Sequence, residues 1–139
     1  GELIGVIPSF MEPWEVKHLG IQTCHVTQSM HERKEMMAEM ADAVIALPGG
    51  FGTLDELFEM LTWKQLDLHQ MPVTILNSAH YYDHLIKHID HMVQEGFLKE
   101  RNLSALHIES NPEELVTYLM NYEPEKMEKK WIYRGKKEV

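Results

Sequence analysis

Residues 43–68 are predicted to form a buried strand, a glycine-rich turn and a long helix, and this succession constrains the fold more than any other stretch. Val44–Leu47 is a short, β-branched apolar run that suits a strand covered on both faces, as in parallel sheets. The Pro48–Gly52 turn has little side-chain bulk, and Thr53 is expected to cap the helix, with Glu56 three residues on. Glycines between strand and helix expose backbone N–H groups at the positive end of the helix dipole, which predicts an anion site.

The rest of the chain alternates between strand-like and helix-like segments, without repeats or low-complexity stretches. This order predicts an α/β fold with a mostly parallel sheet, in which ligands bind beyond the carboxyl ends of the strands. The glycine turn lies at such an end. The expected strands are Leu3–Pro8, Thr23–Thr27, Pro72–Leu76 and Leu106–Ile108, and the expected helices are Met30–Ala41, Tyr81–Glu95 and Pro112–Asn121, with a weaker helical pattern over Trp14–Gly20.

The charge of the chain is strongly uneven. Residues 123–139 hold 6 of the 13 Lys/Arg and 4 of the 22 Asp/Glu. Residues 1–122 therefore hold 7 Lys/Arg and 18 Asp/Glu. An acidic body is a poor partner for a nucleic-acid polymer, because phosphate contacts dominate that affinity. A small phosphorylated ligand needs only a local pocket and is therefore allowed. We predict one domain over residues 1–122, followed by a charged tail over residues 123–139.

Several features favour a cytoplasmic protein. Cys24 is the single cysteine, so no internal disulfide can form, as is typical of a reducing compartment. No apolar run approaches membrane-spanning length, and no signal segment is recognisable. The chain starts at Gly1, without Met, and passes directly into an apolar strand-like run, so a fragment, a processed product or a cloned portion is expected.

Arg33, Lys34 and Glu56 are candidates for chemistry, and each has a structural alternative. At 100° per residue, Arg33 falls between Met37 and Met40 on the apolar stripe of its helix. A buried arginine needs an anionic partner, which is either a structural carboxylate or a phosphate or catalytic carboxylate. Lys34 either adds a second positive charge or is simply solvated. Glu56 either takes part in catalysis or completes a capping box.

A row of histidines resembles a metal site but is not predicted to be one. His80, His84, His88 and His91 follow i, i+4, i+8, i+11 spacing. On a helical wheel they centre about 140° from the apolar face of their helix, and no inward-facing carboxylate cluster accompanies them. We expect them at the surface or at a subunit contact. Cys24 has no Cys-His-acid pattern around it and is expected to pack in the core.

Two sequence blocks resemble the Lonely Guy (LOG) family of cytokinin riboside 5′-monophosphate phosphoribohydrolases, often labelled lysine decarboxylase-like. Met30–Lys34 (MHERK) resembles the family's M-H-x-R-K block, and Pro48–Glu56 (PGGFGTLDE) resembles its P-G-G-x-G-T-x-x-E block. The spacing of 23 residues between Arg33 and Glu56 is also that of the family. The likeness extends from residue 3 to about residue 98.

The resemblance implies a Rossmann-like three-layer α/β sandwich, a homodimer, and no metal or organic cofactor. The implied reaction hydrolyses the N-glycosidic bond of an N6-substituted purine nucleoside 5′-monophosphate, giving free base and ribose 5-phosphate. It implies Arg33 and Glu56 as the catalytic pair. The further substrate contacts that it implies are Glu15, Lys34, Gly49, Gly50, Phe51, Gly52, Thr53 and Thr62. No lysine stands in a context that suggests a pyridoxal Schiff base, so the decarboxylase label has no support in the residues.

The family's upstream strand–helix–strand, with another glycine-rich block, has no counterpart here. We therefore expect a sheet that lacks these N-terminal elements. Two other functions fit the same residues: a broader AMP or nucleotide 5′-monophosphate nucleosidase, and a non-catalytic module that binds nucleotides or phosphate. Release of adenine from AMP favours the first, and ligand binding without base release favours the second.

Overall fold

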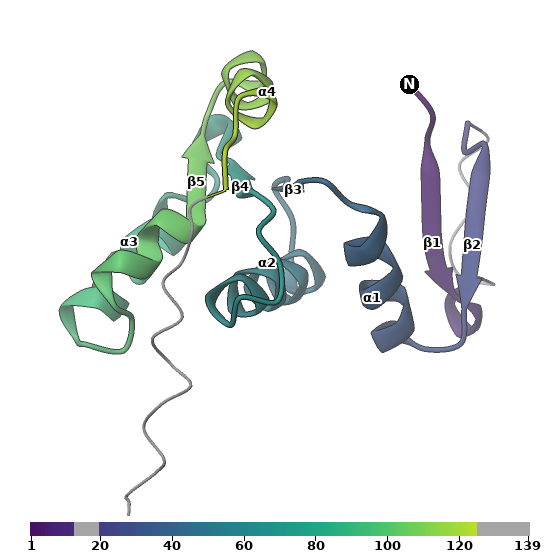
Figure 1. Cartoon of the computed structure of the whole chain (residues 1–139), viewed down its shortest axis with the longest axis horizontal. Coiled ribbons are helices and arrows are strands. Elements are labelled where there is room, and N and C mark those ends of the chain that lie inside the picture. Colours follow the sequence, from purple (N-terminus) through teal and green to yellow (C-terminus); the bar gives the residue numbers. More distant parts are fainter. Residues whose placement is uncertain (13–19, 125–139) are drawn as a thin grey trace, which may run out of the picture. The chain divides into compact units, whose positions relative to one another are not determined.

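The computed structural model describes residues 1–12 and 20–124, and its contacts divide the chain into two units, residues 1–42 and 43–139 (Figure 1). The strands are β1 Ile4–Pro8, β2 Thr23–Thr27, β3 Val44–Ala46, β4 Val73–Leu76 and β5 Leu106–Glu109. The α-helices are α1 Met30–Met40, α2 Phe51–Gln65, α3 Asp83–Gln94 and α4 Pro112–Met120, and the short 3-10 helices are η1 Ser9–Met11, η2 Ser78–His80 and η3 Glu100–Ala105. The alternation of strands and helices confirms the predicted α/β class.

The first unit is a parallel strand pair with one helix against it. β1 and β2 pair in register from Ile4 opposite Thr23 to the end of both strands, and α1 contacts both. Ser29 caps α1 by accepting the Glu32 N–H at 3.1 Å, and the Glu32 carboxylate accepts the Gln28 N–H at 2.7 Å. The predicted capping box is therefore present, with its carboxylate bonded one residue before the cap.

Within the first unit, the apolar stripe predicted on α1 is only partly covered. α1 has no buried residue, and the Met37 and Met40 side chains are exposed. The helix is held by its cap and by its contacts with β1 and β2 rather than by a buried apolar face.

The second unit has a three-stranded parallel sheet in the order β3-β4-β5. β4 is the central strand, and Val73, Thr74 and Ile75 in it are almost completely buried. The Thr74 hydroxyl donates to the Val44 carbonyl at 2.8 Å, so the buried polar group is satisfied. A central strand buried on both faces is what the apolar run at residues 72–76 predicts.

Helices cover both faces of this sheet. α2 contacts β3 and β4, and right-handed crossovers along the order β3-β4-β5 place α2 and α3 on the same face (Figure 1). On β5, His107 stacks on Tyr118 of α4, with ring centroids 3.6 Å apart and planes 7° apart. Successive side chains of a strand point to opposite faces, so Leu106 and Ile108 point away from His107 and α4. These two residues line a pocket together with α2 and α3, which therefore lie on the opposite face from α4. The second unit is thus a three-layer sandwich.

The ends of two helices follow their sequence signals. Asn111 caps α4 and accepts the Glu113 N–H at 2.8 Å, and Pro112 is the first helical residue. α3 ends in a Schellman motif at Gly96, which has φ of +79°. The Gly96 N–H donates to the Val93 carbonyl at 3.0 Å, and the Phe97 N–H donates to the Met92 carbonyl at 2.9 Å.

Other predictions concern the whole chain. Among the residues that the structure describes, no helix combines the length and apolar character needed to cross a bilayer. Most of the predicted helix over residues 14–20 and most of the predicted tail fall outside the described residues. The domain boundary between residues 122 and 123 stays a prediction, as does the homodimer.

Gly96→Ala tests the Schellman end of α3. An alanine Cβ is strained at a φ of +79°, so we expect a loss of about 1–2 kcal/mol in the free energy of unfolding. Urea denaturation at 25 °C measures the difference. Glu95→Ala is the matched control, because Glu95 has ordinary helical dihedral angles, and equal losses in both variants would contradict the role of Gly96.

Candidate functional site

The glycine turn lies at the carboxyl end of β3, where α2 begins earlier than the sequence predicts. Gly50 is the N-cap, with φ −97° and ψ −150°, and no side chain caps the helix. The Gly50 carbonyl accepts the Leu54 N–H at 3.1 Å. The expectation that Thr53 caps α2 is therefore wrong. The extended backbone of Gly50 already provides the helix start, so Thr53 becomes the third helical residue.

This start excludes the capping box as an explanation for Glu56. A capping box requires the carboxylate three residues after the cap, whereas Glu56 comes six residues after Gly50. Glu56 is half-buried and lies four residues after Gly52, so both are on one face of α2. Helical side chains tilt toward the N-terminus, which directs Glu56 toward the first turn. No atom lies within 4 Å of a Cβ built at Gly52, so there is open space beside this residue.

Three backbone N–H groups define the start of α2. The N–H groups of Phe51, Gly52 and Thr53 precede the first i to i−4 hydrogen bond, made by Leu54, and so have no partner within the helix. The Phe51 side chain is 94% exposed. Exposed N–H groups at the positive end of the helix dipole suit a phosphate or a carboxylate.

Among the turn glycines, Gly49 and Gly50 have different reasons to lack a side chain. A Cβ at Gly49 would collide with the Thr53 hydroxyl and lie 2.9 Å from the Thr53 Cβ. The Thr53 side chain therefore packs directly against the Gly49 backbone. At Gly50, no atom lies within 4 Å of an added Cβ, which leaves room for a ligand to approach the backbone.

Two tyrosines from the segment between β4 and α3 bind the carbonyls of the glycine turn. Tyr82 donates its hydroxyl to the Leu47 carbonyl at 2.6 Å, and Tyr81 donates to the Gly49 carbonyl at 2.8 Å. The rings meet edge to face, with centroids 4.9 Å apart. Burial raises the pKa of Tyr82, while a hydrogen bond with the Gly49 backbone opposes the rise. Tyr82 is therefore a neutral hydroxyl donor at physiological pH.

Asn77 organises the segment that carries these tyrosines. Its side-chain oxygen accepts the Tyr82 N–H at 2.7 Å, and its amide nitrogen donates to the Asp83 carboxylate at 2.8 Å. This second bond is the main reason why the pKa of Asp83 is lowered. Ala79 and His80, which lie between Asn77 and Tyr82, have φ of +50° and +59° respectively. This left-handed conformation is strained for residues with a Cβ.

These contacts were not predicted, although a signal for them was present. Residues that follow adjacent parallel strands meet at the same edge of the sheet. Asn77, Tyr81 and Tyr82 follow β4, the neighbour of β3, and therefore meet the glycine turn.

Arg33 and Lys34 lie in the first turn of α1, in the other unit, and both are half-buried. The Arg33 Nε donates to the Val6 carbonyl at 2.9 Å, which ties α1 to β1. This bond uses one of the five N–H donors of the guanidinium group. The pairing of Arg33 with Glu56 and the ligand role of Lys34 stay predictions.

Thr62 is placed apart from the turn. Its hydroxyl donates to the Phe58 carbonyl at 2.7 Å, and its helical position is about 13 Å along α2 from Thr53. Thr62 lines an apolar pocket of about 290 Å³ between α2, α3 and β5. Its ligand contact stays a prediction. Glu15, another predicted contact, falls outside the described residues.

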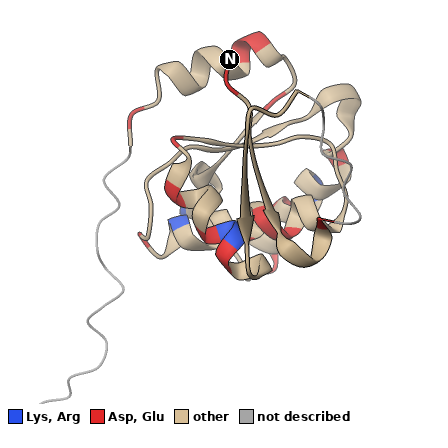
Figure 2. Ribbon diagram, turned by 90° about the vertical axis from the view of Figure 1, so that its right-hand side faces the viewer, with Lys and Arg blue, Asp and Glu red and all other residues tan. Residues whose placement is uncertain are grey.

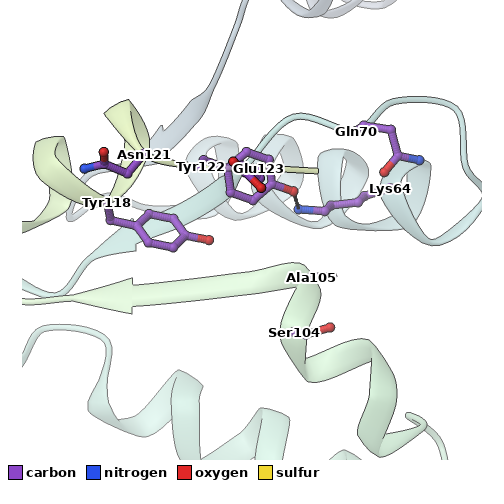
Figure 3. Close-up of a pocket in the computed structure, with 8 residues that line it drawn as sticks. All are labelled: Lys64, Gln70, Ser104, Ala105, Tyr118, Asn121, Tyr122 and Glu123. Carbon is purple, nitrogen blue, oxygen red and sulfur yellow. Dashed lines mark hydrogen bonds between the residues drawn. The ribbon is translucent and has the colours of Figure 1, made fainter. Parts of the chain in front are cut away.

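A second pocket, of about 230 Å³, lies near the C-terminal ends of α2 and α4 (Figure 3). Lys64 in its wall is only 7% exposed. The Lys64 ammonium donates to the Tyr122 hydroxyl at 3.1 Å and lies 5.1 Å from the centroid of that ring. Helix C-terminal ends face the amino end of a parallel sheet, so this pocket and the glycine turn lie at opposite ends of the unit.

The histidine row is exposed along α3 and its approach, as predicted. Within residues 1–12 and 20–124, no three His, Cys, Asp or Glu residues are grouped so as to hold a metal ion. The His80 Nδ1 lies 3.5 Å from a carboxylate oxygen of Asp83, three residues further along the chain. Cys24 in β2 is half-buried rather than part of a closed core.

Acidic residues are spread over the helices of the described chain, and basic residues are few (Figure 2). The formal net charge is −9. No continuous basic surface is therefore available in the described parts for a nucleic-acid backbone.

Comparisons with known proteins agree on one family. A protein-family model described as "Possible lysine decarboxylase" matches residues 1–119. A cytokinin riboside 5′-monophosphate phosphoribohydrolase of Arabidopsis thaliana is 45% identical over 88% of this chain and 57% of its own length. A cytokinin riboside 5′-monophosphate phosphoribohydrolase of Rhodococcoides fascians is 50% identical over 70% of this chain and 50% of its own length. One of Oryza sativa subsp. japonica is 45% identical over 88% of this chain and 51% of its own length. The chain thus spans about half the length of these curated relatives.

Gly49→Ala and Gly52→Ala are expected to change stability in opposite directions. The Cβ at Gly49 overlaps Thr53, so we expect a loss of about 1–3 kcal/mol in the free energy of unfolding. Gly52 is helical with open space around it, so alanine is expected to stabilise the fold by up to about 1 kcal/mol. Urea denaturation compares the two variants, and a Gly49→Ala variant as stable as the wild type would refute the packing at Gly49.

Asp83 is expected to contribute to the pH dependence of stability. Its pKa is lowered in the folded protein from an ordinary 3.8, so its stabilisation is complete above that value and is lost as the pH falls through the folded pKa. In Asp83→Asn, the fall in Tm between pH 7 and pH 3 should therefore be smaller than in the wild type. Circular dichroism measures Tm, and Asp90→Asn, at an exposed carboxylate of the same helix, is the control. An equal acid sensitivity in wild type and Asp83→Asn would exclude this role.

Proposed function

The chain belongs to the Lonely Guy (LOG) family, whose matching model is described as "Possible lysine decarboxylase", and on this basis we propose that the protein hydrolyses the N-glycosidic bond of a purine nucleoside 5′-monophosphate. The products are the free base and ribose 5-phosphate. The preferred substrate in this proposal carries an N6 substituent, as in a cytokinin precursor. The observation that carries the proposal is the exposed start of α2, one helical turn before Glu56.

The 5′-phosphate is proposed to bind the N–H groups of Gly50, Phe51, Gly52 and Thr53. Three of these groups lack partners within α2, and the Gly50 N–H precedes them directly at the cap. Partial positive charge at the helix start favours a phosphate there. Because neither Gly50 nor Gly52 has a side chain, a phosphate oxygen can reach hydrogen-bond distance of the backbone.

Glu56 is proposed to act on the sugar. It lies four residues after Gly52, about 6 Å further along α2 and on the same face. A ribose attached to a phosphate at the helix start spans that kind of distance. Cleavage of an N-glycosidic bond develops positive charge on the sugar, as in glycosidases. A carboxylate near the anomeric carbon stabilises this charge and orients or activates the attacking water.

The remaining residues enter the proposal from the sequence resemblance. Arg33 is assigned to the positioning of Glu56 or to a ligand anion, and Lys34 to a second positive charge near the phosphate. Guanidinium groups bind carboxylates and phosphates in a bidentate manner, so Arg33 suits either role. Glu15 and Thr62 are assigned to further substrate contacts. A cytoplasmic homodimer without cofactor completes the proposal.

Base release from defined nucleotides tests the function. AMP and N6-isopentenyl-AMP are incubated with the protein, and chromatography measures the free base. Adenosine is the control, because it lacks the phosphate. Faster release from the N6-substituted nucleotide supports the proposal, and equal release from both indicates a broader nucleosidase. Nucleotide binding without release of base from either nucleotide would show a binding module and contradict catalysis.

Glu56→Gln is expected to remove most turnover, by at least about 100-fold, while nucleotide affinity is retained. The amide keeps the size of the side chain but loses the negative charge that stabilises the sugar cation. Steady-state base release and calorimetric binding of AMP measure the two effects. Asp55→Asn removes a charge from the same helical turn and is the matched control. Turnover of Glu56→Gln equal to that of the wild type would disprove the assignment.

A further inference from the structure

The tyrosine contacts with the glycine turn add a feature that the proposed reaction does not require by itself. We propose that Tyr81 and Tyr82 are positioning residues: Tyr81 aims the Gly50 N–H at the substrate phosphate by holding the Gly49 carbonyl on the opposite side, and Tyr82 fixes the entry of the chain into the turn by holding the Leu47 carbonyl. This inference rests on the proposed function, since it assumes a phosphate at the start of α2.

The first step concerns the peptide group between Gly49 and Gly50. The described chain contains no cis peptide bond, and in a trans peptide the carbonyl and the following N–H point in opposite directions. Tyr81 holds the Gly49 carbonyl through its hydroxyl, at 2.8 Å. The Gly50 N–H must therefore point away from Tyr81. Gly50 has no side chain, so without this bond its peptide plane is free to rotate to other orientations.

The second step concerns Tyr82, which holds the chain just before the turn. Its hydroxyl donates to the Leu47 carbonyl at 2.6 Å. The next residue, Pro48, has no N–H, so this bond fixes the entry of the chain into the turn and orients no N–H group itself. The Tyr82 side chain is only 3% exposed and forms a fixed support.

The third step concerns the rigidity of the support. Asn77 binds the Tyr82 N–H and the Asp83 carboxylate, and its own N–H donates to the Glu109 carbonyl of β5 at 2.7 Å. These bonds hold the left-handed residues 79 and 80 in place. Strained backbone persists only where its surroundings determine it fully, and it is concentrated at functional sites.

The fourth step is electrostatic. A carbonyl oxygen carries partial negative charge, so a carbonyl that turns toward the ligand repels a phosphate. The tyrosine hydroxyls bind the Gly49 carbonyl and the Leu47 carbonyl just before the turn, which partly offsets that charge and leaves N–H groups for the anion. Phosphate affinity should therefore depend on these two hydroxyls, although neither has to touch the ligand.

Tyr81→Phe and Tyr82→Phe test the inference. Calorimetry measures the dissociation constants of AMP and adenosine, base release measures kcat and KM, and circular dichroism measures Tm. For Tyr81→Phe we expect a rise of about 3–10-fold in the dissociation constant of AMP, the scale of one lost hydrogen bond. The dissociation constant of adenosine should stay unchanged. KM for the nucleotide should rise more than kcat falls.

Tyr118→Phe is the matched control, because this tyrosine stacks on His107 on the other face of the sheet. It should leave the ratio of AMP to adenosine affinity unchanged. A lower Tm for Tyr82→Phe, without a change in this ratio in either variant, would show a merely structural role and overturn the inference. Equal weakening of AMP and adenosine would overturn it as well.

The outcome also separates this inference from the proposed function. If the wild type binds AMP in preference to adenosine but releases no base, the reaction is refuted while the effect of the tyrosines on phosphate affinity is still measured. If base is released and both variants keep wild-type AMP affinity, only the inference fails. A wild type that does not prefer AMP to adenosine would refute both.

Discussion

The close packing of Thr53 against the backbone of Gly49 is the contact on which the candidate site depends. It brings the chain from β3 into helical geometry at Phe51, without a side-chain cap. Because the helix starts there, three N–H groups have no partner within the helix and Glu56 falls on the second turn. The same start leaves the Leu47 and Gly49 carbonyls outside α2, where the tyrosines bind them.

Local signals predicted most elements of the fold, because the interactions behind them are local. Ser29 and Asn111 cap their helices by bonds to residues two or three positions away, and Gly96 supplies the left-handed conformation that ends α3. The same rule failed at Thr53. The preference for threonine over glycine as a cap is statistical, and here the threonine side chain is used to pack against Gly49 instead.

The candidate site was predictable only in part. The glycine turn follows directly from a strand-to-helix connection, and parallel sheets place ligands at that edge. The tyrosine bonds join residues 32 and 35 positions apart, so no local pattern contains them. Arg33 illustrates the same limit, since its position on the helical wheel did not predict the bond to the Val6 carbonyl, 27 residues away. Long-range polar contacts depend on which loops meet.

The left-handed pair at Ala79 and His80 has a consequence for local opening of the protein. The segment that contains these residues is held to the glycine turn by two phenolic bonds and to β5 by Asn77, so the turn and the segment form a single cooperative unit. A ligand that binds the turn therefore also stabilises the start of α3, and by reciprocity a change at the start of α3 alters ligand affinity. Variation in this exposed loop can thus adjust affinity without altering the glycines themselves.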